Sequence, residues 1–140
     1  MASFNKFEAF TEHLAEKVHD LDLDTIKVYL TDNAPSASLD AVKADLVESL
    51  STANGYTAGG ADATAATSRS GGTTSVTGVD IVWTASGGSI GPFRYAVLYN
   101  DTPTSPADPL IGWWDYGSSI TLASGETFTV DFGASMFTLA

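Results

Sequence analysis

The chain has 140 residues, of which 17 are acidic and 6 are basic, and its net charge is −11 at pH 7. This length is typical of one domain that can bury its own core, and the acidic excess argues against binding to nucleic-acid phosphates. The sequence contains no cysteine, which excludes disulfides, thiolate metal sites and a cysteine nucleophile. It has no apolar run long enough for a membrane span and no signal-peptide pattern, so we expect a soluble protein made in a cytoplasm.

Residues 3–21 are predicted to form one amphipathic helix. Ser3 suits the N-cap position, and apolar side chains recur at spacings of three and four residues, which places them on one stripe of a helix. The stripe consists of Phe4, Phe7, Phe10, Leu14, Val18 and Leu21. It fits two interpretations, since the helix could pack on its own domain or act as an N-terminal arm that docks on another subunit.

The two histidines predict no metal site. His13 and His19 are six residues apart, and this spacing turns a helix by about 600°, so the two rings would point to different sides. We expect both side chains to be solvated.

The next third of the chain shows weaker patterns. Residues 25–30 alternate apolar and polar side chains and predict a strand. Residues 39–50 favour a short helix, although 47–51 could also pair as a strand. Residues 51–74 are rich in Gly, Ala, Thr and Ser, and we expect a long loop there, with one weak strand around 61–68 and Tyr56 as its anchor.

Residues 90–116 carry the strongest β signal. The first strand places Phe93, Tyr95, Val97 and Tyr99 on one face, a loop with three prolines follows, and 110–116 alternate again. Adjacent residues of a strand face opposite sides. We therefore expect Trp113, in register with Ile111, to enter the core. Trp114, in register with Leu110 and Tyr116, is expected to be exposed.

The remaining strands are predicted at 79–84, 119–122 and 127–132, with an edge strand at 136–139. Turn signals between these short segments indicate an antiparallel sandwich or barrel-like body of about six to eight strands. We therefore predict an α+β fold in which an N-terminal helix, 1–21, precedes a single β-rich domain, 22–140, with a Gly/Ala/Thr-rich loop at 51–74.

The residues predict no catalytic, cofactor-binding or metal site. No serine lies in a G-x-S-x-G motif, and the aspartates around the 100–109 loop (Asp101, Asp108 and Asp115) lack the spacing of a calcium-binding loop. No two carboxylates are paired as glycoside hydrolysis requires. The expected contact residues are apolar instead, namely Phe4, Phe7, Phe10, Leu14, Trp114 and Tyr116. An exposed Trp114 would suit a protein interface or stacking on a sugar.

Four segments resemble a family of small proteins of tailed bacteriophages, whose genes lie among those for virion structure. The segments are KVYLTDNAP, NGYTAGG, FRYAVLYNDTP and PLIGWWDYGSSITLASGETFTVDF. The resemblance covers about residues 25–139 and does not include 4–20. It implies a non-enzymatic structural role in the virion and transfers no site residue.

From this resemblance we expect a capsid decoration (cement) protein, assembled in the host cytoplasm, which binds the major capsid protein or other virion proteins. We expect a homo-oligomer, with a trimer as the first choice, and neither nucleic acid nor membrane as a partner. A head fibre, neck or tail component is the neighbouring alternative. A carbohydrate-binding or receptor-binding module that uses exposed aromatic rings is an alternative of another class.

Overall fold

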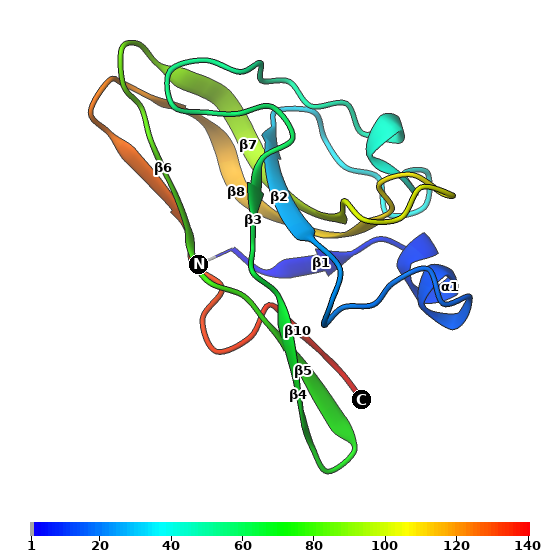
Figure 1. The fold of residues 1–140 in the computed structure, drawn as a ribbon. Helices are drawn as coiled ribbons and strands as arrows, with labels where there is room; N and C mark the ends of the chain where they lie inside the picture. The colour runs from blue at the N-terminus through cyan, green and yellow to red at the C-terminus, as the bar shows by residue number, and fades with distance from the viewer. Residues whose placement is uncertain (1) are drawn as a thin grey trace.

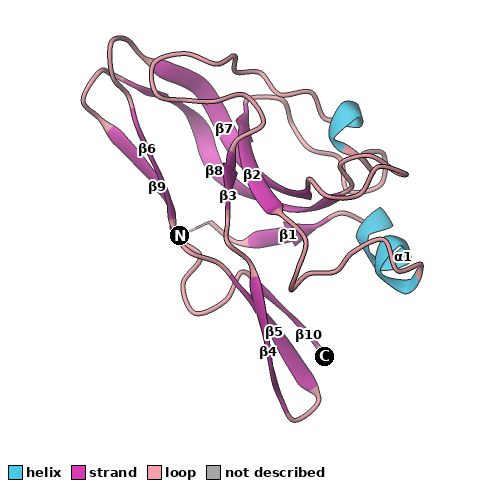
Figure 2. Cartoon of the chain, in the orientation of Figure 1, coloured by secondary structure: helices cyan, strands magenta, loops and turns pink. Residues whose placement is uncertain are grey.

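A computed structural model describes residues 2–140 as antiparallel β structure with one short α-helix (Figures 1 and 2). The elements are β1 (Phe4–Lys6), α1 (Ala9–Ala15), β2 (Ile26–Thr31), the 3-10 helix η1 (Lys43–Asp45), β3 (Ala61–Asp62), β4 (Ala66–Ser70), β5 (Thr73–Thr77), β6 (Ile81–Thr84), β7 (Ile90–Asn100), β8 (Leu110–Leu122), β9 (Thr127–Val130) and β10 (Phe137–Leu139). The predicted class, a helix with antiparallel β structure, is confirmed. No helix within residues 2–140 combines the length and the apolar character that a membrane span requires.

The strands form three sheets, with the predicted β7–β8 hairpin inside the largest. The order is β1-β8-β7-β2-β3 in the five-stranded sheet, β10-β5-β4 in the three-stranded sheet and β6-β9 in the two-stranded sheet. Apolar side chains cover both faces of the five-stranded sheet. One face joins the main core, which also contains residues of the two smaller sheets, and the other face carries a smaller cluster that includes Tyr29, Val97 and Leu110.

Bulges change the predicted alternation in β7 and β8. Phe93 pairs with Ile120, whereas Tyr95 pairs with Asp115, so β8 contains extra residues between these pairs. Gly117 lies there with φ 88°, a conformation that glycine adopts without steric cost. β7 also departs from regular alternation here, because Phe93 lies in the main core, while Tyr95, two residues further on, lies in the cluster on the opposite face. The prediction that both share one face is wrong, and so is the predicted division into separate strands at 110–116 and 119–122, because β8 is continuous over Leu110–Leu122.

A second irregularity reverses the prediction for the two tryptophans. The register shifts between Leu98 and Tyr99, so that Ile111 is an extra residue of β8 and the alternation changes phase after it. Trp114 therefore enters the main core and is 6% exposed. Trp113 is half-buried and packs on Phe7, with ring centroids 4.6 Å apart.

The predicted bounds of the helix at 3–21 are also wrong. Residues Phe4–Lys6 form β1, which pairs with β8, and the α-helix covers Ala9–Ala15 only. Gly112 permits this pairing because a Cβ there would lie 2.3 Å from the Phe4 ring. The rings of Phe7 and Phe10 are fully buried within the chain, so in this structure they offer no surface to another subunit.

The segment 39–50 is extended rather than helical, apart from η1. The amide of Lys43 donates to the carbonyl of Asp108 at 2.9 Å, and the amide of Leu110 donates to the carbonyl of Ala41 at 3.0 Å. These bonds hold the segment along the loop between β7 and β8, which prevents a continuous helix. Leu39, the first residue of the predicted helix, is 79% exposed.

Residues 51–74 are not one loop. The weak strand expected at 61–68 is present as β3 and the first part of β4, and β4 continues into a hairpin with β5. Figure 1 shows this hairpin (green) extending away from the five-stranded sheet. Tyr56 is buried, which confirms its prediction as an anchor. Gly60, with φ 79°, lies so close to β2 that a Cβ would meet the Val28 carbonyl oxygen at 1.8 Å.

Candidate functional site

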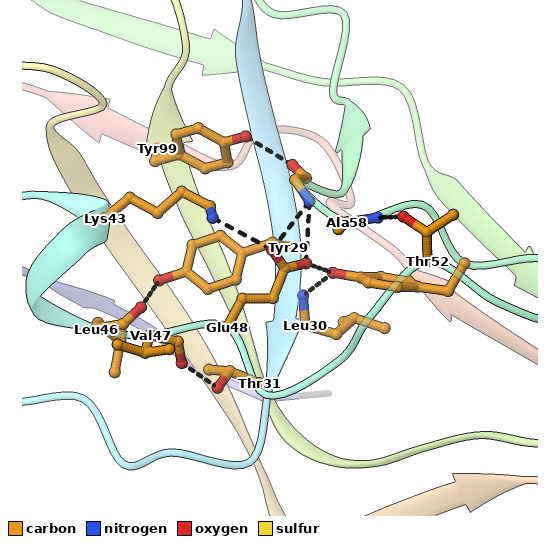
Figure 3. Close-up of polar contacts among 12 residues, drawn as sticks. Tyr29, Leu30, Thr31, Lys43, Leu46, Val47, Glu48, Thr52, Ala58 and Tyr99 are labelled. Atoms are coloured by element: carbon orange, nitrogen blue, oxygen red, sulfur yellow. Dashed lines mark hydrogen bonds and ion pairs between the residues drawn. The ribbon is translucent and has the colours of Figure 1, made fainter.

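A buried polar cluster lies where residues 43–60 cross β2 (Figure 3). We call it the Glu48 cluster, and it consists of Tyr29, Lys43, Glu48, Tyr56, Gly59 and Tyr99. The Glu48 side chain is only 9% exposed. A buried carboxylate costs free energy unless charged or hydrogen-bonding partners surround it, so its contacts decide what the cluster can do.

Both oxygens of the Glu48 carboxylate are bound by donors of its own chain. The amide of Gly59 donates to both oxygens, at 3.1 and 2.9 Å. The Lys43 ammonium lies 3.2 Å from Oε2, and the Tyr56 hydroxyl donates to Oε1. These contacts compensate the buried charge and fix the 56–60 turn on the 43–48 segment.

The three tyrosines connect the cluster to the sheet. The Tyr29 hydroxyl donates to the carbonyl of Leu46 at 2.7 Å, and the Tyr99 hydroxyl donates to the carbonyl of Gly59 at 2.6 Å. The Tyr56 hydroxyl oxygen accepts a hydrogen bond from the amide of Leu30 at 3.0 Å. This bond satisfies a backbone donor of β2 at a residue that β3 does not pair with. Burial together with the charge of Glu48 raises the pKa of Tyr29 and of Tyr56 above the usual range, so both hydroxyls remain donors.

Lys43 is positioned by two aromatic rings as well as by its ion pair. Its Nζ lies 4.8 Å from the centre of the Tyr29 ring and 5.8 Å from that of Tyr99. A cation over a ring face is attracted to the π electrons. The cluster therefore acts as a structural connection between the 43–60 segment and β2 and β7.

A surface hollow of about 400 Å³ adjoins the Glu48 cluster. It is lined by Lys43, Ala44, Val47, Glu48, Leu50 and Asp108. Burial and the neighbouring Asp101 raise the pKa of Asp108, whose backbone has φ 49°. The lining of the hollow includes neither a histidine nor a hydroxyl side chain, and its second carboxylate, Glu48, is already bound to Lys43, Tyr56 and the amide of Gly59.

The three aspartates around the 100–109 loop separate into two environments. Asp101 lies beside Asp108 and forms an ion pair with Lys27 at 3.0 Å. Asp115 pairs instead with Arg94, which donates to both carboxylate oxygens at 2.8 and 3.1 Å. Arg94 and the amide of Gly117 lower the pKa of Asp115. Within residues 2–140, no three His, Cys, Asp or Glu side chains are grouped to hold a metal ion.

The two histidines lie together, contrary to the prediction. The helix ends at Ala15, and Lys17 with φ 63° turns the chain back, so that the ring centroids of His13 and His19 are 6.1 Å apart. His19 is buried, and its Nδ1 lies 3.1 Å from Nδ2 of Asn100. Desolvation, and to a lesser extent His13, lower the pKa of His19 to about 4, whereas Asp24 opposes the shift.

The structure brings several predicted contact residues together as core rather than as a surface. Phe4 packs on Trp114 and on Phe137, and Phe10 packs edge to face on Phe137. Leu14 and Tyr116 are partly buried against the main core. The burial of Trp114 removes the ring that would have formed a platform for sugar stacking.

Sequence reasoning missed the Glu48 cluster. Glu48 follows a charged segment and has no spacing relation to Tyr29, Tyr56 or Tyr99 that a motif could reveal. The one available signal was Tyr56, a large aromatic residue within a stretch of small residues. Searches of protein-family models, of curated proteins and of solved structures find no match to this chain.

Proposed function

We propose that this protein is a structural component of a tailed-bacteriophage virion and acts as a capsid decoration protein. The proposal rests on the resemblance over residues 25–139 and on one structural observation, the β4–β5 hairpin that extends from the body (Figure 1). In this proposal the hairpin contacts the major capsid protein or another virion protein. We also propose that the main core makes the three sheets a sandwich-like body and that the protein forms a homo-oligomer, with a trimer as the first choice.

The hairpin has the properties of a contact element. β4 is the outer strand of its sheet, and four of its five residues are exposed. An outer strand presents backbone donors and acceptors to a partner. Arg69 near the hairpin tip donates to the carbonyl of Gly71 and forms no ion pair within residues 2–140. On a chain with a net charge of −11, this guanidinium suits an acidic site on a partner.

Exposed apolar side chains near the hairpin add area for contact with a virion protein. Val79 follows β5 and is 61% exposed, and Val82 of β6 is 56% exposed. A protein that binds assembled shell subunits and not dissociated ones adds its binding free energy to the stability of the shell. This mechanism needs no catalytic group.

The test is a particle-binding assay. Virions lacking this protein should bind the purified chain at a copy number comparable to that of the shell subunits. Arg69→Glu should weaken binding about ten-fold or more, because a like charge then faces the acidic site. Lys6→Glu makes the same change in net charge at an exposed position of β1 and serves as the matched control.

Two outcomes would contradict the proposal. A copy number far below that of the shell subunits would instead indicate a head fibre, neck or tail component. Equal losses for Arg69→Glu and Lys6→Glu would show that only net charge matters and that the hairpin is not the contact element.

A further inference from the structure

The segment after α1 places a titratable side chain in the interior without a full set of partners. His19 is 9% exposed and packs on the Phe10 ring, with centroids 5.2 Å apart. Its Nε2 and the Nδ1 of His13 are buried and lack hydrogen-bond partners within residues 2–140. His19 Nδ1, by contrast, has a defined partner in Asn100.

The hydrogen bonds of Asn100 determine which His19 nitrogen carries the proton. Asn100 is fully buried, and its Oδ1 accepts the amide of Thr102 at 3.1 Å. Its Nδ2 therefore faces the other way, toward Asp24 Oδ2 at 2.7 Å and His19 Nδ1 at 3.1 Å. An amide NH₂ group can only donate, so His19 Nδ1 must accept. The neutral ring consequently carries its proton on Nε2.

This tautomer has two consequences. A second proton on His19 would have to bind Nδ1, where it would face the NH₂ group of Asn100. Two hydrogen-bond donors would then point at each other and could form no hydrogen bond. The protonated ring must therefore leave Asn100. Neutral His19 also has no lone pair on Nε2, so the histidine pair does not suit a metal ion in this arrangement.

The surrounding loop joins Asn100 to the base of the β4–β5 hairpin. Asp24, held by Asn100, accepts the amide of Asp20 at 2.9 Å. In the same loop, Asp22 Oδ1 accepts both the amide and the hydroxyl of Thr67 at 3.0 Å. Thr67 belongs to the outer strand β4, so Asp22 occupies a backbone donor at its free edge.

The charged groups near His19 come from its own loop and from α1. His13 lies on α1 and Asp24 on the loop, while the residue that β7 contributes, Asn100, is uncharged. An adjoining hollow of about 440 Å³ is lined by His19 together with Lys17, Asp20, Asp22 and Asp24. Phe10, which also packs on the His19 ring, is uncharged.

We propose that His19 and Asn100 form a pH-sensitive latch, which holds the 16–24 loop on β7 while His19 is neutral and releases the loop when His19 binds a second proton. Release also separates Asp22 from Thr67 and frees the edge of β4. Burial lowers the pKa of His19 from 6.5 to about 4, so the latch should open as the pH falls through this interval.

Hydrogen exchange and nitrogen NMR on the full-length chain test the latch. At neutral pH the His19 ring should show protonated Nε2 and unprotonated Nδ1. As the pH falls from about 6.5 to about 4, the hydrogen-bonded amides of the loop and of Thr67 should lose protection. These are the amides of Asp20, Asp22, Leu23, Asp24 and Thr67. His19→Gln should keep them protected, because a glutamine oxygen accepts the Asn100 NH₂ group at every pH in this range.

His13→Gln is the matched control. It removes a positive charge that opposes protonation of His19, so it should retain the transition and shift it to higher pH. The latch is refuted if His19→Gln loses the same protection at the same pH as the wild type, since carboxylates would then cause the release. It is also refuted if the wild-type ring carries its neutral proton on Nδ1, a measurement that does not depend on how any variant folds.

Discussion

Phe4 lies edge to face against Trp114, with the ring centroids 5.4 Å apart. The two residues meet because β1 pairs with β8, and the pair Phe4 and Trp114 is part of that register. Phe132 also packs on the tryptophan, with ring centroids 5.6 Å apart. Trp114 therefore connects the N-terminal strand to the C-terminal part of the chain through the main core.

The two tryptophans should differ in their contribution to stability. Trp114→Ala should lower the free energy of unfolding by about 3–5 kcal/mol, the range for emptying a large buried aromatic site. Trp113→Ala removes a half-buried ring that packs mainly on Phe7 and should cost clearly less. Urea unfolding of both variants measures the difference. A larger loss for Trp113→Ala would contradict the assignment of Trp114 to the core.

Glu48 should stabilise the fold through its ionised carboxylate. Glu48→Gln replaces one acceptor oxygen with an NH₂ group, so Lys43 loses its ion pair and one of the other donors loses its acceptor. We expect a loss of about 1–3 kcal/mol in the free energy of unfolding. Glu12→Gln makes the same chemical change at an exposed position of α1 and should have little effect. Equal effects of the two substitutions in urea unfolding would show that the Glu48 cluster is not a stabilising connection.

The N-terminal segment should be required for folding. Phe7 and Phe10 are fully buried, so deletion of residues 1–15 would expose both faces of the five-stranded sheet where these rings pack. We expect the truncated chain to lose cooperative thermal unfolding in circular dichroism. Phe10→Ala should cost about 3–5 kcal/mol, whereas Leu23→Ala, at a side chain that is 80% exposed, should change stability by about 0.5 kcal/mol or less. A truncated chain that unfolds like the wild type would restore the interpretation as a docking arm.

The free energy of unfolding should decrease as the pH is lowered, because His19 then binds a proton. Because burial lowers its pKa in the folded state from 6.5 to about 4, the unfolded chain binds more protons in this interval. The contribution of neutral His19 is therefore complete above about pH 6.5 and is lost as the pH falls toward 4. We expect the free energy of unfolding to decrease by about 2 kcal/mol over the interval, after allowance for solvent screening. Urea unfolding of wild type and His19→Gln at several pH values isolates this part, and parallel curves for the two proteins would argue against it.

Local sequence patterns determined the β7 and β8 segments, their connecting loop and the edge strand at the C-terminus. A period of two in apolar residues predicts a strand because alternate side chains of a strand face one side, whatever the strand later packs against. Prolines exclude regular structure at 101–109 for an equally local reason. Tyr56 could be predicted as an anchor because it is the one large apolar residue in its stretch.

Tertiary structure alone decided the N-terminus and the faces of the hairpin. Phe4, Phe7 and Phe10 fit a helical stripe, but pairing of Phe4–Lys6 with β8 satisfies backbone groups that an isolated helix would satisfy locally. Alternation shows that Trp113 and Trp114 face opposite sides. It does not show which side is more buried when both faces of a sheet are covered and a bulge at Ile111 changes the phase.

The Glu48 cluster and the histidine pair depend on tertiary structure for the same physical reason. Each joins side chains whose separation in the chain follows no helical or strand period, because loops of irregular backbone bring them together. The sequence by itself determined several of the strands, namely β2, β6, β7 and β9, and which residues can ionise. The register of the strands and the turn at Lys17 decided which of those residues meet, and with that the pKa of His19.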